Sequence, residues 1–181
     1  MSEIESHDHA EGHAWAPQAG FETIITTLGA NILAGIGFAL LITAALMLHG
    51  DVNWYRGLLW GAGGFASFAL APAVGLPPEL PGMAAADLMG RQAWWMGTAL
   101  ATAGGLGLLF VGRRPKWAVV GVMMIIAPHL IGAPHVNAPD TGLPPELIIE
   151  FGIASLVANL LFWAALGIAS GLLFEKLRPA P

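Results

Sequence analysis

Charged residues are scarce in this 181-residue chain, at 10% of the total, and cysteine is absent. Soluble domains carry about 25% charged residues, so the composition excludes an ordinary soluble fold. Only seven residues are basic against twelve acidic ones, for a net charge of −5, which excludes nucleic-acid binding through a basic face. Without cysteine there are no disulfides, thiolate metal sites or thiol nucleophiles. What is abundant is apolar: 56% of residues are hydrophobic and the mean hydropathy is +0.68, which predicts an integral membrane protein.

Uncharged stretches predict five transmembrane helices, each close to the ~20 residues that cross ~30 Å of hydrocarbon. They are apolar around their whole circumference, which is typical of an all-α, multi-pass bundle embedded in lipid. The predicted helices lie within 24–48, 57–74, 92–112, 117–133 and 151–174. The chain then divides into three parts. Residues 1–18 form an acidic, His-bearing extracytoplasmic tail, residues 19–175 a transmembrane helical domain, and residues 176–181 a cytoplasmic tail.

Basic residues are distributed unevenly among the predicted loops. If the five helices alternate in direction, six of the seven basic residues fall on one side and only Arg91 falls on the other. Cytoplasmic loops are enriched in Lys and Arg, so the N-terminus is predicted outside and the C-terminus in the cytoplasm. Residues 1–18 contain neither a basic segment nor an apolar core, so no signal peptide is predicted there.

The string Gly-Leu-Pro-Pro-Glu-Leu occurs twice, at 75–80 and 142–147, each time after an inside-to-outside helix. This recurrence predicts two hairpins in the same orientation, 57–112 and 117–174, related by an axis along the membrane normal as in some transporters. Taken residue by residue, Pro-Pro-Glu is better explained as a helix start, with proline at the first position and a carboxylate near the positive end of the dipole. The helix within 24–48 would form a third hairpin if another helix preceded it.

Small and polar residues recur inside the predicted helices. Small residues four apart predict close helix packing, which we favour over flexible hinging; they are Gly57 and Gly61, then Gly97, Ala101 and Gly105, then Gly167 and Gly171. Asn31 and Asn159 lie near the middle of two helices and could line a cation path. Interhelical hydrogen bonds of about 0.6 kcal/mol are the commoner use of such residues.

Histidines provide the candidate metal ligands. His7, His9 and His13 alternate with acids in the N-terminal tail, and imidazole with carboxylate suits cobalt, nickel or zinc. A solvated tail without function is an equally good interpretation of these three. His129 and His135 lie at the outer end of the helix predicted within 117–133, where two prolines and a glycine disfavour a regular helix and irregular backbone is tolerated if it lines a cavity. Loop residues hydrated by water are the simpler interpretation of this second pair.

Two acids follow these histidines at helical spacing. Glu146 and Glu150 are four residues apart, and Glu150 lies about 6 Å deeper in its helix. An ionisable residue within the membrane predicts function, while an interfacial acid reaching the headgroups is the alternative for Glu150. The candidate metal ligands are therefore His7, His9, His13, His129, His135, Glu146 and Glu150. No Walker A, H-E-x-x-H or G-x-S-x-G motif is present, so the chain is not expected to be an enzyme and no cofactor is expected.

The string GLLWGAGGFASFALAPAVGLPPELPGMAAADLMGRQAWWMGTALATAGGL, with a His-bearing tail before it and APHLIGAPH after it, resembles the CbtA family of predicted cobalt transporter subunits. The resemblance covers nearly the whole chain. It implies a multi-pass protein of the prokaryotic inner membrane that takes up Co²⁺ for cobalamin synthesis. It also implies a small single-span, His-containing partner subunit, CbtB. Family members carry a further apolar segment before a longer His-rich stretch, and neither is found in these 181 residues.

Two classes of function follow from these features. The first is a subunit that moves a divalent cation, Co²⁺ or Ni²⁺, past His129, His135, Glu146 and Glu150. The second is a membrane scaffold that transports nothing itself and captures metal for a partner transporter. A homo-oligomer is compatible with both.

Overall fold

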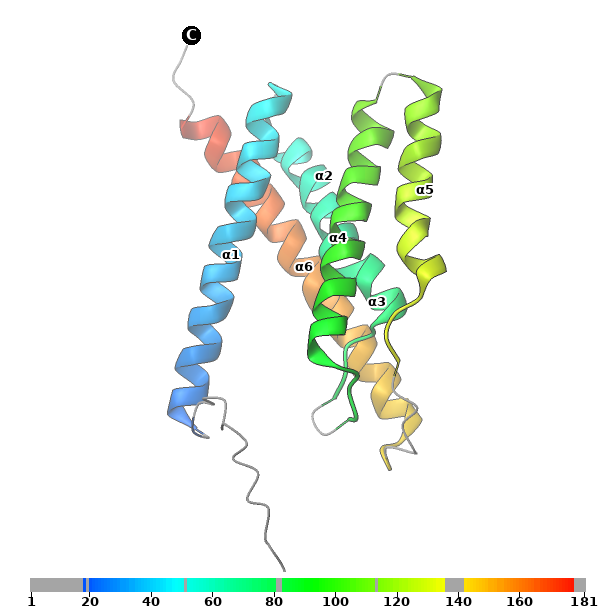
Figure 1. The fold of residues 1–181 in the computed structure, drawn as a ribbon. Helices are drawn as coiled ribbons and strands as arrows, with labels where there is room; N and C mark the ends of the chain where they lie inside the picture. Colours follow the sequence, from blue (N-terminus) through cyan, green and yellow to red (C-terminus); the bar gives the residue numbers. More distant parts are fainter. Residues whose placement is uncertain are drawn as a thin grey trace, which may run out of the picture. The chain divides into compact units, whose positions relative to one another are not determined.

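The computed structural model describes residues 18, 20–50, 52–80, 83–112, 114–135 and 142–177. Within these ranges the chain forms α-helices and one π-helical turn, with no β-strand (Figure 1). This confirms the predicted all-α fold class. The elements in chain order are α1 (Phe21–His49), α2 (Trp54–Phe65), the π-helix η1 (Ala66–Leu70), α3 (Ala71–Gly75), α4 (Leu88–Val111), α5 (Pro115–Ile131) and α6 (Pro145–Leu177).

Each of the five predicted transmembrane helices has a helical counterpart. Four segments of the described chain are long and apolar enough to cross a membrane. The fifth, α5, is apolar but has only 17 residues, or about 26 Å at the rise of an α-helix. The chain therefore has the architecture of a multi-pass helical membrane protein. The four longer segments are Phe21–Leu48, Trp54–Gly75, Leu88–Val111 and Pro145–Leu177.

The chain divides into two compact units, residues 1–37 and 38–181, and the boundary falls inside α1. In the first unit, the described part of α1 exposes large apolar side chains such as Ile24, Leu28 and Ile32. Lipid chains are the natural surroundings for such a surface. The second unit contains the remaining helices, and every contact described below lies within it.

The second predicted helix is interrupted by a π-helical turn. Residues 54–75 run without a break as α2, η1 and α3, and the N–H of Ala71 donates to the carbonyl of Ala66 five residues earlier. Pro72 follows at once. Its ring has no N–H to give to the carbonyl of Phe68 and would crowd that group in a regular α-helix. The wider turn makes room for the ring, and Pro72 is buried there.

The two copies of the repeated string adopt different structures. Pro145 is the first residue of α6, as predicted for a helix start. The helix therefore begins six residues before the predicted boundary at residue 151 and includes Glu146 and Glu150. Pro77 and Pro78, by contrast, start no helix; α4 begins only at Leu88. After the first copy the chain continues Pro-Gly, which breaks a helix, whereas after the second it continues Ile-Ile, which extends one.

Asp87 sets the start of α4. Its carboxylate accepts a hydrogen bond of 2.8 Å from the N–H of Gly90, in the manner of an N-cap residue. The carboxylate predicted to begin this helix, Glu79, is thereby free for another role. The prediction that Pro-Pro-Glu begins a helix is thus correct for the second copy and wrong for the first.

Glycines allow α2 and α6 to pack closely. A Cβ atom added to Gly57 would collide with the carbonyl oxygen of Gly167, and one added to Gly61 would lie 3.2 Å from the Cα of Gly167. Gly171 in turn approaches the backbone of Asn53 and Trp54. These contacts confirm close packing at the Gly57–Gly61 and Gly167–Gly171 pairs.

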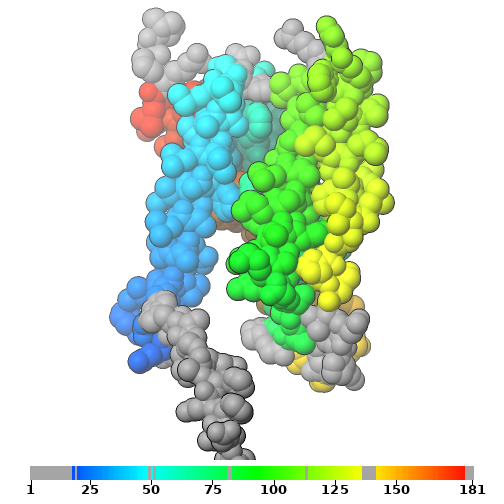
Figure 2. Space-filling view, viewed as in Figure 1, coloured from blue at the N-terminus to red at the C-terminus, as the bar shows by residue number. Residues whose placement is uncertain are grey.

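A second close pair joins α4 to α5, and Figure 2 shows the two helices lying against each other along their length. Gly105 and Gly121 approach each other's backbone there, whereas a Cβ on Gly97 would meet only open space. Gly97 therefore takes no part in the predicted ladder of small residues. The most extensive packing joins α2 to α6 and α4 to α5 rather than the helices within each predicted hairpin.

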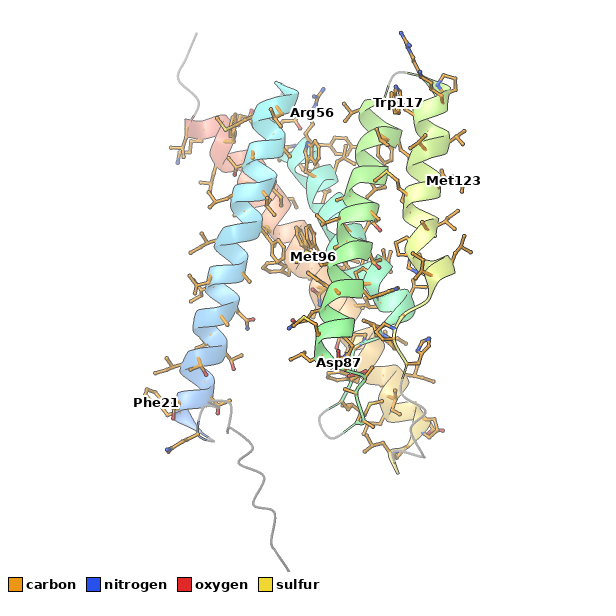
Figure 3. The ribbon with its side chains drawn as sticks, viewed as in Figure 1. Phe21, Arg56, Asp87, Met96, Trp117 and Met123 are labelled. Atoms are coloured by element: carbon orange, nitrogen blue, oxygen red, sulfur yellow. The ribbon has the colours of Figure 1, made fainter. Side chains whose placement is uncertain are left out.

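The ends of the bundle differ in charge. Arg56 at the start of α2 and Trp117 at the start of α5 lie at one end, and Asp87 lies at the other (Figure 3). Lys116 in the first turn of α5 and Lys176 in the last turn of α6 add positive charge to the first end. Basic residues gathered at one end are what the sequence predicts if successive helices alternate in direction.

Candidate functional site

His129 lies in the last turn of α5 and is half-buried. Its ring stands nearly perpendicular to the indole of Trp94, with the centroids 5.9 Å apart. The Trp94 indole N–H also donates to the carbonyl oxygen of Pro128 at 3.3 Å. The end of α5 is thereby held against α4 by an aromatic contact and a hydrogen bond.

His135 lies beyond the end of this helix. The helix predicted within 117–133 continues through Pro128 to Ile131 and stops at Gly132, whose φ is +87°, so the irregular backbone expected around the two histidines begins after His129. A positive φ is costly for residues other than glycine, so Gly132 ends the helix cleanly. His135 follows four residues after the helix and is exposed.

Glu146 and Glu150 lie in the first two turns of α6, and both are exposed. They share one face of the helix, as their spacing predicts. Asn159 lies further along α6, where its amide N–H donates to the backbone carbonyl of Ser155 at 3.0 Å. Asn31 is exposed in the part of α1 that belongs to the first unit.

The described residues do not bring the candidate metal ligands into one cluster. Across the ranges that the structure describes, no group of three or more His, Asp or Glu side chains is close enough to hold a metal ion. His129 is on α5, which packs on α4, whereas Glu146 and Glu150 are on α6, which packs on α2. The tail histidines His7, His9 and His13 lie outside the described residues.

A pocket of about 390 Å³ lies where η1, α3 and the segment after α3 meet α4 and α6. Its apolar walls include Phe68 of the π-turn and Trp95 of α4. Asn159, proposed from sequence as a path residue, lines the pocket from α6. The other polar or charged groups that line it are Glu79, Arg91 and Gln92.

An ion pair stands at this pocket. Nη2 of Arg91 lies 2.8 Å from Oε2 of Glu79, and the two side chains are 28% and 26% exposed. The Nε of Arg91 is buried and has no hydrogen-bond partner among the described residues. The Nε–H of Arg91 and the carboxylate of Glu79 are therefore both held beside this pocket, whose other lining residues are largely apolar.

Sequence reasoning missed this pair. It assigned Glu79 to a helix start and treated Arg91 only as the single basic residue on its side of the membrane. That isolation was itself a signal, since a lone arginine among acids at the edge of the hydrocarbon needs a partner. Which acid serves as the partner depends on the path of the segment between α3 and α4.

Apolar helices long enough to cross a membrane, with positive charge gathered at one end, define a multi-pass helical membrane protein. The chain belongs to the CbtA family: the model described as "Probable cobalt transporter subunit (CbtA)" matches residues 1–175, which is essentially the whole chain. The family resemblance found in the sequence is thereby confirmed. Searches of curated proteins and of solved structures returned no match.

Proposed function

We propose that this chain is the membrane-embedded subunit through which Co²⁺ is taken up for cobalamin synthesis. The observation that carries the proposal is the pocket, because an ion pair and two amide side chains line a hollow between apolar helices. Such groups are expensive within a membrane and are found along ion pathways. Membership of a family of probable cobalt transporter subunits makes cobalt the preferred ion, with nickel as a second candidate.

The proposed route uses residues at the end of the bundle where Asp87 lies. His129, His135, Glu146 and Glu150 are at or near that end, and Asn159 lines the pocket from deeper in α6. Imidazole and carboxylate groups are suitable ligands for Co²⁺. In this proposal His7, His9 and His13 capture the ion at scarce concentrations.

Partner and placement form part of the same proposal. A transporter subunit implies a second subunit, and a small single-span CbtB-type protein is the partner we propose, with self-association as a further possibility to be tested. We propose the prokaryotic inner membrane as its location, with the N-terminus outside. The grouping of Arg56, Arg114, Lys116 and Lys176 at one end supports a cytoplasmic position for that end. The chain performs no chemical reaction in this proposal.

One observation favours a second candidate function. Among the described residues, no three His, Asp or Glu side chains lie close enough together to hold a metal ion. A metal-capture or scaffold subunit would need no complete ligand set of its own, because its partner would complete it.

Uptake measurements separate these functions. The purified chain would be placed in proteoliposomes alone or with the partner subunit, and the entry of radiolabelled cobalt would be followed against empty vesicles. Uptake by the chain alone supports the transport function. Uptake that requires the partner, with cobalt binding retained by the chain alone, supports the capture function, and absence of both overturns the proposal.

A further inference from the structure

We propose that Glu79 is the carboxylate that receives a divalent cation in the pocket, and that Arg91 holds this carboxylate until the cation displaces it. The inference deepens the proposed function and rests on it for the identity of the ion as cobalt. It assigns a binding role to two residues for which the sequence suggested only structural roles.

Side chains that bear oxygen line the pocket from three separate segments, with Glu79 partly buried and Gln92 and Asn159 exposed. Glu79 comes from the segment that follows α3, Gln92 comes from the second turn of α4, and Asn159 comes from α6. The hydrogen bond from Asn159 to Ser155 uses the amide N–H and leaves the amide oxygen as an acceptor. Carboxylate, amide carbonyl and water are ligands that a divalent cation such as Co²⁺ accepts. The pocket is roomy enough for an ion that keeps several of its waters.

The position of Arg91 is explained by the need to balance the charge of Glu79. A carboxylate three-quarters buried in an apolar bundle is costly unless a positive charge accompanies it. The guanidinium supplies that charge as a tethered cation of single charge. A divalent ion carries twice the charge and competes for the same carboxylate, after which the guanidinium must leave it.

The unpaired Nε of Arg91 favours movement of the guanidinium away from Glu79. Because this N–H is buried without a partner, the present position of the guanidinium leaves one donor unsatisfied. Leaving Glu79 for a position with more water would satisfy that donor. The ion pair is consequently strong enough to neutralise the carboxylate and incomplete enough to be displaced.

The π-turn supplies a second, independent observation. Phe68 of η1 forms part of the pocket wall together with Pro72, the residue that requires the wider turn. Single π-turns inside helices are frequently found at functional sites. The helix irregularity and the ion pair therefore meet at the same pocket.

Glu79→Gln and Arg91→Gln test the inference because it requires them to act in opposite directions on Co²⁺ affinity. Co²⁺ binding to the full chain in lipid nanodiscs would be measured by calorimetry, with His7, His9 and His13 replaced by Ala so that the tail does not contribute. We expect Glu79→Gln to weaken binding at least about tenfold, because the charged ligand is lost. Arg91→Gln should tighten binding only about two- to fivefold, because the ion pair that competes with the cation is partly solvated and contributes little free energy.

Glu175→Gln is the matched control. Glu175 is an exposed acid near the other end of α6, so its loss removes the same charge without touching the pocket and should leave the affinity unchanged. A merely structural ion pair predicts that both pocket variants weaken binding together. That outcome overturns the inference, and so does a Glu79→Gln variant that binds Co²⁺ like its parent.

A second variant protects the test against misfolding. Arg91→Met keeps the length of the side chain and is compatible with a membrane, so it replaces Arg91→Gln if that variant fails to insert. Co²⁺ should raise the melting temperature of either Arg91 variant by more than it raises that of the parent, since the ion supplies the missing positive charge. An equal or smaller rise contradicts the inference.

Uptake by the unaltered chain separates this inference from the proposed function. If the parent transports cobalt and Glu79→Gln binds normally, the inference fails and the transport function stands. If the parent does not transport cobalt while the two variants change Co²⁺ affinity in opposite directions, the transport function fails and the pocket stands as a capture site.

Discussion

The indole of Trp163 lies parallel to the ring of Phe68, with the ring centroids 5.6 Å apart and the planes 11° from parallel. Trp163 is only 3% exposed and also contacts the ring of Phe38, at a centroid distance of 4.6 Å. Phe68 belongs to the π-turn and forms part of the pocket wall. This contact therefore ties the irregular turn to α6 and fixes one side of the pocket.

Replacing Trp163 with Ala should destabilise the protein strongly. The substitution leaves a cavity between α6, η1 and the second half of α1, and large aromatic side chains lost from a packed core cost about 3–5 kcal/mol. The free energy of unfolding would be measured in mixed micelles by titration with a denaturing detergent. Phe162→Ala, which removes a neighbouring aromatic residue that is 39% exposed, is the matched control and should cost far less. Equal losses in the two variants would contradict the assigned core.

Gly57→Ala should separate α2 from α6. The added methyl group would collide with the carbonyl of Gly167, and backbone cannot yield as a flexible side chain can, so we expect a loss of about 1–3 kcal/mol. Gly97→Ala is the control, because its methyl group meets nothing within 4 Å and alanine favours a helix by up to about 1 kcal/mol. The same unfolding titration measures both variants. A Gly57→Ala protein as stable as Gly97→Ala would disprove the close contact.

Single cysteines should report the sidedness of the bundle. The chain has no cysteine of its own, so Arg114→Cys and Ala85→Cys each introduce one thiol at an exposed position, at opposite ends. An impermeant maleimide added to intact cells should label Ala85→Cys, whereas Arg114→Cys should react only after the cells are opened. Labelling of both from outside, or the reverse pattern, would contradict the proposed orientation.

Glu150→Gln tests the proposed ion route independently of the pocket. Glutamine keeps the volume of the side chain and removes the charge that attracts a divalent cation, so folding should survive. We expect cobalt uptake at saturating metal to fall at least about tenfold, and by less for Glu146→Gln, which lies about 6 Å nearer the start of the helix. Membrane expression of each variant is the control. Normal uptake by a well-expressed Glu150→Gln protein would make Glu150 an interfacial acid.

Helix positions were predictable from the sequence because each depends on a local apolar run. Pro145 also begins its helix as predicted, since a proline at the first position needs no partner outside the helix. The same string at Pro77 failed as a predictor because Pro81 and Gly82 follow it closely, so the local rule was overridden by the next few residues.

The pairing of helices and the ion pair were beyond sequence reasoning. Nothing in the run from Trp54 to Gly75 indicates that α2 packs mainly on α6, which begins 80 residues after α2 ends. Likewise, Glu79 finds Arg91 because the segment after α3 passes beside the start of α4, which is a tertiary relationship. Histidine is the residue type whose imidazole most readily suggests a metal ligand from sequence, and the residues that line the pocket include no histidine.

The π-turn has a consequence for the rotational phase of the helix that contains it. One α-helical turn holds 3.6 residues, so a single residue corresponds to a rotation of about 100° around the axis. Residues 66–70 absorb one such residue, which sets the direction in which α3 presents Pro72 and Ala73 to the pocket. Closing this turn to a regular α-helix with the same number of residues would rotate α3 by about that angle and carry both residues off the pocket wall, whereas deleting one residue within 66–70 would restore α-helical register and keep α3 in phase. The shape of the pocket therefore depends on how the backbone between Phe65 and Ala71 is wound as well as on the side chains that line it.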